Sequence, residues 1–360
     1  MNFIGIDLHT NRFTCCYLSE DPSFKRMETF TLDQTGLDRF YATLDKESSV
    51  ILEATINTFA FVSLFENKVK KVLIANTYQL KEAGPKQKKT DKVDAFKLAQ
   101  KLKAEIMSGV QQIHAVFLPS KEYRDLRALF ASYRVLRKEI TMTKNRIHSL
   151  LKENLFPFTK EFIFGKKTRL QIRSISPDEI LSFQINLFMD TLEALEAKAE
   201  ELENKIMIFG QRFMPMVEIL TSMSGISVIT ALALIADVVD VSRFQNAKHF
   251  TSYLRSAPRV ESSNEHTLIK STNKAGRRLS VTLLSQSLNH FRDSNKKLAV
   301  WYTRLSVYKK KGVIRMALCR RVFAEIYQMM KKGENHYFRN PVLHEKKIAQ
   351  YKAFLAKEKK

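Results

Sequence analysis

The amino-acid sequence predicts three successive parts: an α/β domain over residues 1–119, a helical insert over 120–210 and a mainly helical domain over 211–332, followed by a basic tail over 333–360. Three observations predict this fold class. Short apolar runs alternate with helical patterns in the first part, two heptad stripes follow, and the third part keeps the helical period with no convincing alternation of strands.

The first domain is expected to begin with a meander of three short strands, because three runs rich in Ile, Phe, Thr and Cys are separated by polar breaks. They cover residues 2–8, 12–18 and about 25–32. Helical and apolar runs then alternate over 33–44, 48–54, 57–67, 70–75 and 91–105. The order βββαβαβα, antiparallel at first and parallel with helical crossovers afterwards, is typical of the ribonuclease-H-like (RNase H-like) fold.

Two apolar stripes with heptad spacing predict the long helices of the insert. The first stripe runs from Leu126 to Leu150 and the second from Phe188 to Phe209, and the segment between them contains Pro157. One interpretation is an antiparallel hairpin that packs on itself. The other is an intermolecular coiled coil that sets the oligomeric state.

The charge of the chain is its most unusual bulk property. There are 60 Lys and Arg residues against 37 Asp and Glu residues, which gives a net charge of +23, while 44% hydrophobic residues are too many for a disordered chain. Three cysteines cannot build a disulfide framework, and no run approaches the ~20 apolar residues that span a membrane. We therefore expect a cytoplasmic, nucleoid-associated protein with no membrane segment and a nucleic acid as its polyanionic partner.

Four acidic residues fall where this fold would bring them together. Asp7 closes the first strand, Glu53 closes the fourth, and Asp91 and Asp94 lie on one face of the last helix of the domain. Clustered carboxylates repel one another unless a cation holds them, and such oxygen ligands suit Mg²⁺ or Mn²⁺, which promote phosphoryl transfer. The alternatives are ordinary helix-capping acids or, for the run IGID, the phosphate loop of actin-like kinases, which usually continues with Gly and Thr.

The third part carries hydroxyl and basic groups that suit reaction with a phosphate. Ser262 and Ser263 are expected in a polar loop among these basic groups, where a serine hydroxyl could attack a phosphate. The alternative is that they are ordinary loop residues, because serine is common in loops. Expected nucleic-acid contacts near that loop and in a later basic stretch are Lys270, Lys274, Arg277, Arg278, Lys310, Arg320 and Arg321. For each of these cations a solvated face is the alternative.

The sequence resembles the insertion-sequence-110 (IS110) transposases, which include the pilin-gene invertases. The motifs IGIDLH, VILEAT and KKTDKVDAFKLA are similar to the RuvC-like DEDD domain of that family. The run LRALFASYRVLRKEITMTKNRIHSLL is similar to its coiled-coil region, and SGISVITALALIADVVDVSRFQNAKHFTSYLRSAPR to its helical transposase domain. The resemblance covers nearly the whole chain.

This resemblance implies DNA recombination that excises and inserts a mobile element. It implies that Asp7, Glu53, Asp91 and Asp94 hold Mg²⁺, and that a serine of the helical domain attacks DNA to form a covalent serine-DNA link. Counted from the preceding proline, that serine is Ser263, with Ser262 as the alternative register. It further implies a guide RNA, the bridge RNA, and a homodimer or homotetramer.

The sequence departs from the family pattern in the serine domain. Glycine is usual where Ser227, Arg255 and Asn264 stand, and a leucine is usual where Ser256 stands. Two alternatives therefore remain beside the transposase. One is a DEDD Mg²⁺-dependent nuclease that acts on branched DNA, and the other is a domesticated relative that only binds nucleic acid.

Overall fold

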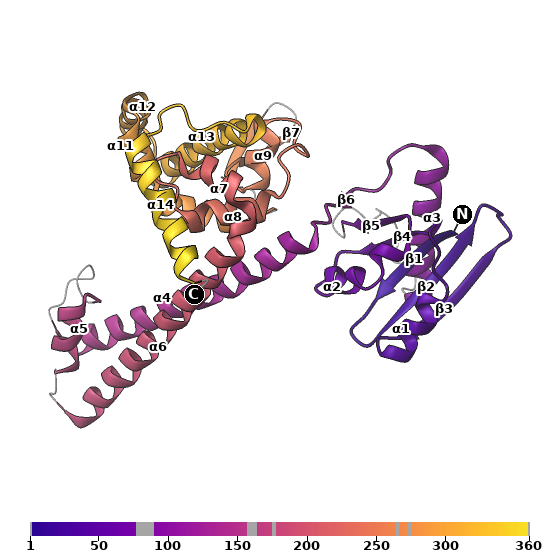
Figure 1. Ribbon diagram of the computed structural model, residues 1–360, viewed down its shortest axis with the longest axis horizontal. Helices are drawn as coiled ribbons and strands as arrows, with labels where there is room; N and C mark the ends of the chain where they lie inside the picture. The colour runs from indigo at the N-terminus through magenta and orange to yellow at the C-terminus, as the bar shows by residue number, and fades with distance from the viewer. Residues whose placement is uncertain are drawn as a thin grey trace. The chain divides into compact units, whose positions relative to one another are not determined.

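A computed structural model describes residues 2–76, 90–156, 164–174, 178–263, 266–272 and 276–358. The chain divides into two compact units, Met1–Lys121 and Glu122–Lys360 (Figure 1). Each unit has its own hydrophobic core.

The first unit is built on one six-stranded mixed sheet with the strand order β3-β2-β1-β4-β5-β6. The strands are β1 (Asn2–Leu8), β2 (Arg12–Ser19), β3 (Lys25–Thr31), β4 (Ser49–Glu53), β5 (Lys71–Ala75) and β6 (Ala115–Val116). Strands β1, β2 and β3 pair antiparallel, β1, β4 and β5 pair parallel, and β6 pairs antiparallel with β5. The order of elements is the expected one, with the two-residue β6 as an addition.

Helices cover both faces of this sheet because its central strands are apolar on both sides. One core combines Ile4 and Ile6 of β1 with Phe40 of α1 (Gln34–Tyr41) and Phe61 of α2 (Thr58–Ser63). A short 3-10 helix, η1 (Glu66–Lys68), follows α2. On the opposite face, Phe3 packs with Leu98 of α3 (Asp91–Ser108).

The second unit begins with a hairpin of two long helices, α4 (Lys121–Glu153) and α6 (Glu179–Gly210), drawn side by side in Figure 1. Their apolar stripes share one cluster, to which α4 contributes Ile147 and α6 contributes Ile185. The short helix α5 (Lys166–Arg173) lies between them in sequence. The stripes thus pack within one chain, as the hairpin interpretation predicts.

The rest of the second unit is mostly helical, as expected. It contains the 3-10 helix η2 (Gln211–Phe213) and α7 (Met214–Thr221), α8 (Val228–Val238), α9 (Ala247–Tyr253), α10 (Leu279–Gln286), α11 (Leu288–Ser294), α12 (Lys296–Ser306), α13 (Lys311–Lys332) and α14 (Pro341–Lys357). Helix α8 is apolar except for Thr230 and Asp237, and all its residues from Thr230 onward are buried. A helix of this composition forms the centre of a core rather than its edge.

The third part also contains one hairpin, in a region where the sequence showed no convincing alternation of strands. Strands β7 (Pro258–Ser263) and β8 (His266–Thr272) form an antiparallel two-stranded sheet. Val260 stands between two charged residues in β7, and β8 contains the β-branched residues Thr267, Ile269 and Thr272, which favours a sheet. The polar residues around them hid this signal.

The segment expected to be a basic tail is partly buried. Helix α14 buries Ile348, Tyr351 and Leu355, and the last two belong to the core of the second unit. These residues recur at the spacing i, i+3, i+7, which forms one apolar stripe among the lysines of the helix. The Tyr351 hydroxyl also donates to the Met207 carbonyl at 2.6 Å.

Candidate active site

Asp7 and Glu53 lie at the same edge of the sheet because β1 and β4 run parallel. Ile6 pairs with Leu52, so Asp7 and Glu53 occupy the next position along their strands. Side chains alternate between the two faces of a strand, so residues an even number of positions apart share a face. Phe3, four positions before Asp7, and Ile51, two positions before Glu53, both pack on the α3 side. Asp7 and Glu53 are therefore on the face that α3 covers.

Gly5 allows α3 to approach this face closely. A Cβ atom at Gly5 would lie 2.1 Å from the Ala95 carbonyl oxygen and 2.4 Å from the Ala99 nitrogen. Only a residue without a side chain fits against the helix backbone at this position. The contact brings the beginning of α3 next to the end of β1.

The first turn of α3 supplies the other two acids. Thr90 is the N-cap, and its Oγ1 accepts a hydrogen bond from the Val93 nitrogen at 3.4 Å. Asp91 and Asp94 follow in the first turn, where the helix dipole stabilises negative charge. The helix therefore starts at the acids it presents to the sheet.

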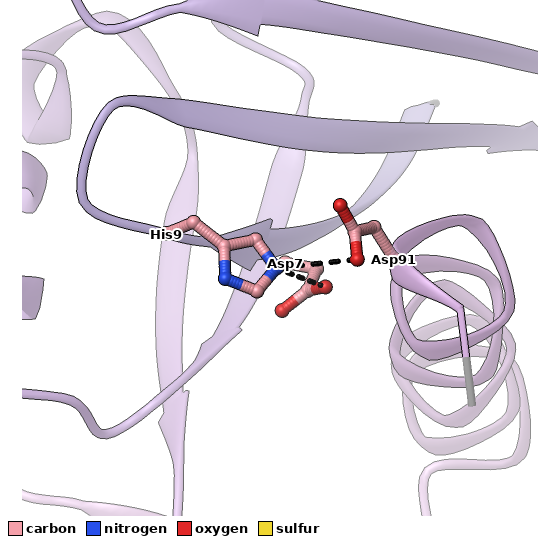
Figure 2. Close-up of side chains that lie close together, drawn as sticks. All are labelled: Asp7, His9 and Asp91. Atoms are coloured by element: carbon pink, nitrogen blue, oxygen red, sulfur yellow. Dashed lines mark hydrogen bonds and ion pairs between the residues drawn. The ribbon is translucent and has the colours of Figure 1, made fainter.

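Asp7, His9 and Asp91 meet at this edge (Figure 2), and one oxygen or nitrogen from each lies within 4.8 Å of the others. His9 Nε2 is 3.1 Å from Asp7 Oδ2 and 3.4 Å from Asp91 Oδ1. Arg12 Nη2 contacts the other oxygen of Asp91 at 3.1 Å. The side chains are 22% exposed for Asp7, 33% for Asp91 and 47% for His9, so solvent ions can reach the group.

The electrostatics of Asp7 indicate a place for a cation. Burial is the largest cause that raises the pKa of the Asp7 carboxyl, and the charges of Asp91 and Asp94 raise it further. His9 acts in the opposite direction through its charge and its hydrogen bond. A divalent cation among these carboxylates would relieve both the repulsion and the loss of hydration.

The structure thus brings part of the predicted acid set together. Asp7 and Asp91 share one cluster, and Asp94 lies close enough to influence the pKa of Asp7. Glu53 stands at the same edge but is not in the three-residue cluster found among the described residues. His9 is the member that sequence reasoning missed, and its signal was a histidine two positions after the strand-end aspartate.

The two candidate serines lie in a strand rather than in a loop, which corrects our expectation. Ser262 pairs with Thr267 and Ser263 with His266. Both serines are therefore at the end of β7, next to the connection to β8. Asn264 lies outside the described residues, and Ser263 is the last described residue before it.

Two residues with positive φ angles, Arg255 and Gly276, flank this hairpin and contact one another. Arg255 adopts φ 56°, at one of the positions where the resemblance predicts glycine. Its Nε donates to the Gly276 carbonyl at 2.7 Å. Gly276 has φ 96°, and a Cβ there would lie 2.2 Å from the Tyr253 carbonyl oxygen. Arg255 therefore takes over the backbone geometry of a glycine and adds a hydrogen bond.

Ser227, a second position where glycine is usual, acts as the N-cap of α8. Its φ is −86°, in the region that any residue adopts, and its hydroxyl accepts from the Thr230 nitrogen at 3.2 Å. Serine is among the best N-cap residues. This departure from the family pattern therefore has a structural explanation.

The predicted basic contacts are scattered over several elements. Arg277 donates its backbone N–H to the Tyr253 carbonyl at 2.9 Å. Burial opposes ionisation of Tyr253, yet Arg243, Arg127 and Arg277 together lower its pKa. The remaining predicted contacts have these places: Lys270 in β8, Arg278 at the N-cap of α10, Lys310 at the N-cap of α13, Arg320 in α13, Arg321 stacked on Trp301 at 4.0 Å, and Lys274 outside the described residues.

Comparisons with known proteins match two parts of the chain to transposase families. A family model for the DEDD domain of IS110-type transposases, described as a transposase, matches residues 4–157. A second model, described as the transposase IS116/IS110/IS902 family, matches residues 217–298. No curated protein matches the chain. Among the helices of the described residues, none has the length and apolar character needed to cross a membrane.

Proposed function

The chain belongs to the IS110 family of transposases and is a DNA recombination enzyme, and from this premise we propose that it excises and inserts a mobile element with Mg²⁺-bound acids and a serine nucleophile. The observation that carries the proposal is the meeting of Asp7 and Asp91, which are far apart in sequence. Both come from a unit that we propose to be RNase H-like and RuvC-like, because its strand order and crossovers follow that pattern.

The acid residues fit a divalent metal ion. Asp7, Asp91, Asp94 and Glu53 offer carboxylate oxygens at one sheet edge, and Asp7 carries a raised pKa that a cation would reverse. Hard cations such as Mg²⁺ and Mn²⁺ prefer oxygen ligands. When bound, the metal would polarise the phosphodiester and stabilise negative charge on it.

The protein side chains would prepare this site. Arg12 holds the Asp91 carboxylate in place through a contact at 3.1 Å, and His9 Nε2 lies 3.1 Å from Asp7 Oδ2. Gly5 fixes the distance between the strand and the helix that carry them. Preorganised ligands of this kind need little rearrangement when the substrate arrives.

We propose Ser263 as the nucleophile, with Ser262 as the alternative. In the reaction, the serine oxygen forms a bond to phosphorus, the bond from phosphorus to the leaving sugar oxygen breaks, the serine proton passes to solvent or a base, and the sugar oxygen takes up a proton. The phosphoester link conserves the bond energy, so strand exchange needs no ATP. Support comes from the match to the second family model and from the hairpin that holds both serines at one end.

A guide RNA and a homodimer or homotetramer complete the proposal. The net charge of +23 suits a protein that carries both DNA and RNA. The predicted cations Lys270, Lys274, Arg277, Arg278, Lys310, Arg320 and Arg321 are candidates for phosphate contacts. The resemblance described above implies the bridge RNA and the oligomer.

The test uses labelled element-end DNA, RNA transcribed from the flank of the element, Mg²⁺ and the full-length protein. We expect a denaturation-resistant protein-DNA adduct that is lost in Ser263→Ala and in Asp7→Asn, whereas Ser262→Ala retains it. An adduct that survives Ser263→Ala but not Ser262→Ala would assign the neighbouring serine. Omission of the RNA should abolish the adduct if guidance is required.

Two other outcomes would reject the recombinase mechanism. Cleavage with free DNA ends that depends on Asp7 but on neither serine would identify a DEDD nuclease that acts through metal-activated water. Salt-sensitive binding with no Mg²⁺-dependent product, unaffected by Asp7→Asn, would identify a domesticated nucleic-acid-binding protein.

A further inference from the structure

We infer that the His9 imidazole is a direct ligand of the metal ion that Asp7 and Asp91 hold, an inference that rests on the proposed metal-dependent function. His9 is outside the four-acid set that the family motif implies. Its Nε2 and one oxygen from each aspartate lie within 4.8 Å of one another, so a single ion could contact all three.

The distances within this group suit neighbouring ligands of one ion. Nε2 lies 3.1 Å from Asp7 Oδ2 and 3.4 Å from Asp91 Oδ1. Two ligand atoms that are each about 2.1 Å from an octahedral metal, at a right angle to one another, stand about 3.0 Å apart. The imidazole nitrogen therefore needs only a small movement to bind the same ion as both carboxylates.

The backbone around His9 directs the ring toward the acids. His9 lies in the turn between β1 and β2, next to the pair that Leu8 forms with Phe13. The backbone N–H of His9 donates to the Arg12 carbonyl at 3.0 Å. Asn57 Nδ2 donates to the His9 carbonyl at 3.4 Å. Figure 2 shows the ring turned from this loop toward Asp7 and Asp91. The turn, the strand and the helix thus each provide one ligand.

A histidine that only orients a metal-bound carboxylate would make different contacts. Such a histidine donates a hydrogen bond to a single carboxylate, and it does so at the oxygen that does not face the ion. Here Nε2 approaches oxygens of two carboxylates at once, while Arg12 contacts the opposite oxygen of Asp91. The position between two acids is that of a ligand, and Arg12 already orients Asp91.

A nitrogen ligand has a consequence for metal selectivity. Mg²⁺ is bound in proteins through oxygen ligands, whereas imidazole nitrogen suits first-row transition metals. With His9 in the coordination sphere, the site should favour Mn²⁺ over Mg²⁺ more strongly than an all-carboxylate site does. Exchange of the imidazole for a carboxylate should reduce that preference.

The experiment measures Mn²⁺ binding to the full-length protein by electron paramagnetic resonance, with pulsed detection of the coupling between Mn²⁺ and a ¹⁴N nucleus. Wild type is compared with His9→Gln, His9→Asp and Asp7→Asn. His249→Gln is the matched control, because His249 is an exposed histidine of the second unit. Mg²⁺ affinity is obtained by competition against Mn²⁺.

We expect ¹⁴N coupling in wild type and in His249→Gln but not in either His9 variant. His9→Gln should weaken Mn²⁺ binding by about 10-fold or more, since even outer ligands contribute about 10- to 100-fold. His9→Asp should restore metal binding without the nitrogen signal, and should lower the ratio of Mn²⁺ to Mg²⁺ affinity.

The possible failures are distinguishable. Mn²⁺ bound by wild type without ¹⁴N coupling, and lost in Asp7→Asn, would overturn the role of His9 and leave the acid site intact. A nitrogen signal that persists in His9→Gln would assign the coupling to another of the eight histidines and also overturn it. Absence of Mn²⁺ binding in wild type, or equal binding in Asp7→Asn, would overturn the proposed metal site together with this inference.

Discussion

Gly5 controls the geometry of the acid cluster although it has no functional group. Gly5→Ala should lower the free energy of unfolding of the first unit by about 1–3 kcal/mol, because the new methyl group would meet the α3 backbone at 2.1 Å and α3 would have to move. Urea denaturation measures this change. Gly312→Ala is the control, since that position has open space around it, and its effect should stay within about 1 kcal/mol. Equal stabilities for the two variants would contradict close packing of α3 on β1.

Arg255 stores backbone strain that a glycine would avoid. The two variants Arg255→Ala and Arg255→Gly both lose the hydrogen bond to the Gly276 carbonyl, but only glycine relieves the left-handed conformation at φ 56°. We therefore expect Arg255→Gly to be more stable than Arg255→Ala by about 1–2 kcal/mol in thermal unfolding. If alanine proved as stable as glycine, the left-handed conformation would be refuted.

Asp7 predicts a pH dependence of stability in the metal-free protein. Burial, Asp91 and Asp94 raise the pKa of this carboxyl against the opposing effect of His9, so the ionised form opposes folding. The metal-free protein should become more stable as the pH falls from neutral through the raised pKa toward the ordinary value of 3.8. Asp7→Asn should be more stable than wild type at neutral pH in a chelator, and the difference should shrink at acidic pH.

The comparison for Asp7 is Asp33, whose pKa shifts the other way. The Gly36 backbone N–H is the largest cause that lowers the pKa of Asp33, which therefore stabilises the folded state when ionised. Its contribution is present above pH 3.8 and is lost as the pH falls through the lowered pKa. Urea titrations between pH 4 and 7.5 should give Asp7→Asn and Asp33→Asn opposite signs at neutral pH, and the same sign for both would contradict the assignment.

At the scale of elements, ion pairs reinforce the helical hairpin. Glu196 of α6 contacts Lys144 of α4 and Arg169 of α5, each at 2.7 Å. Burial opposes its ionisation, but the two cations outweigh burial and lower the pKa of Glu196. The stabilisation is therefore present at neutral pH and is lost as the pH falls through the lowered pKa.

Removal of the Glu196 charge should weaken the hairpin. Glu196→Gln should reduce the free energy of unfolding by about 0.5–1.5 kcal/mol at neutral pH, measured by urea denaturation. Glu201→Gln is the matched control, because Glu201 pairs with Lys198 three residues away on an exposed helix face. Its effect should be close to zero, and a loss as large as that of Glu196→Gln would contradict a special role for the three-residue network.

Elements with strong periodicity could be predicted, and elements with weak periodicity could not. The meander, the crossovers and the α4 and α6 stripes follow from apolar spacing. The β7–β8 hairpin was not predicted from the sequence because its strands are largely polar. Asp7 and Asp91 were predictable because a strand end and a helix start have fixed places in the fold. The role of His9 depends on the conformation of a short turn, which apolar spacing does not encode.

At the scale of the whole molecule, the two units should respond differently to metal. The hydrophobic clusters of the first unit contain no residue of the second, so calorimetry should resolve two unfolding transitions. Mg²⁺ at about 100 times its Kd should stabilise only the transition of the first unit, by about 2.7 kcal/mol. Asp7→Asn should abolish this shift. A Mg²⁺ effect on the other transition alone would contradict the position of the site.

The packing of α14 has a consequence for the order of events during synthesis. The Tyr351 hydroxyl reaches the Met207 carbonyl across 144 positions of sequence, and Leu355 completes the same core. The ribosome must therefore release the chain as far as Leu355 before the helical unit can close, whereas the sheet that carries Asp7 and the helix α3 that carries Asp91 are both complete once β6 emerges. Stalled nascent chains probed with protease should show the sheet protected long before the helices.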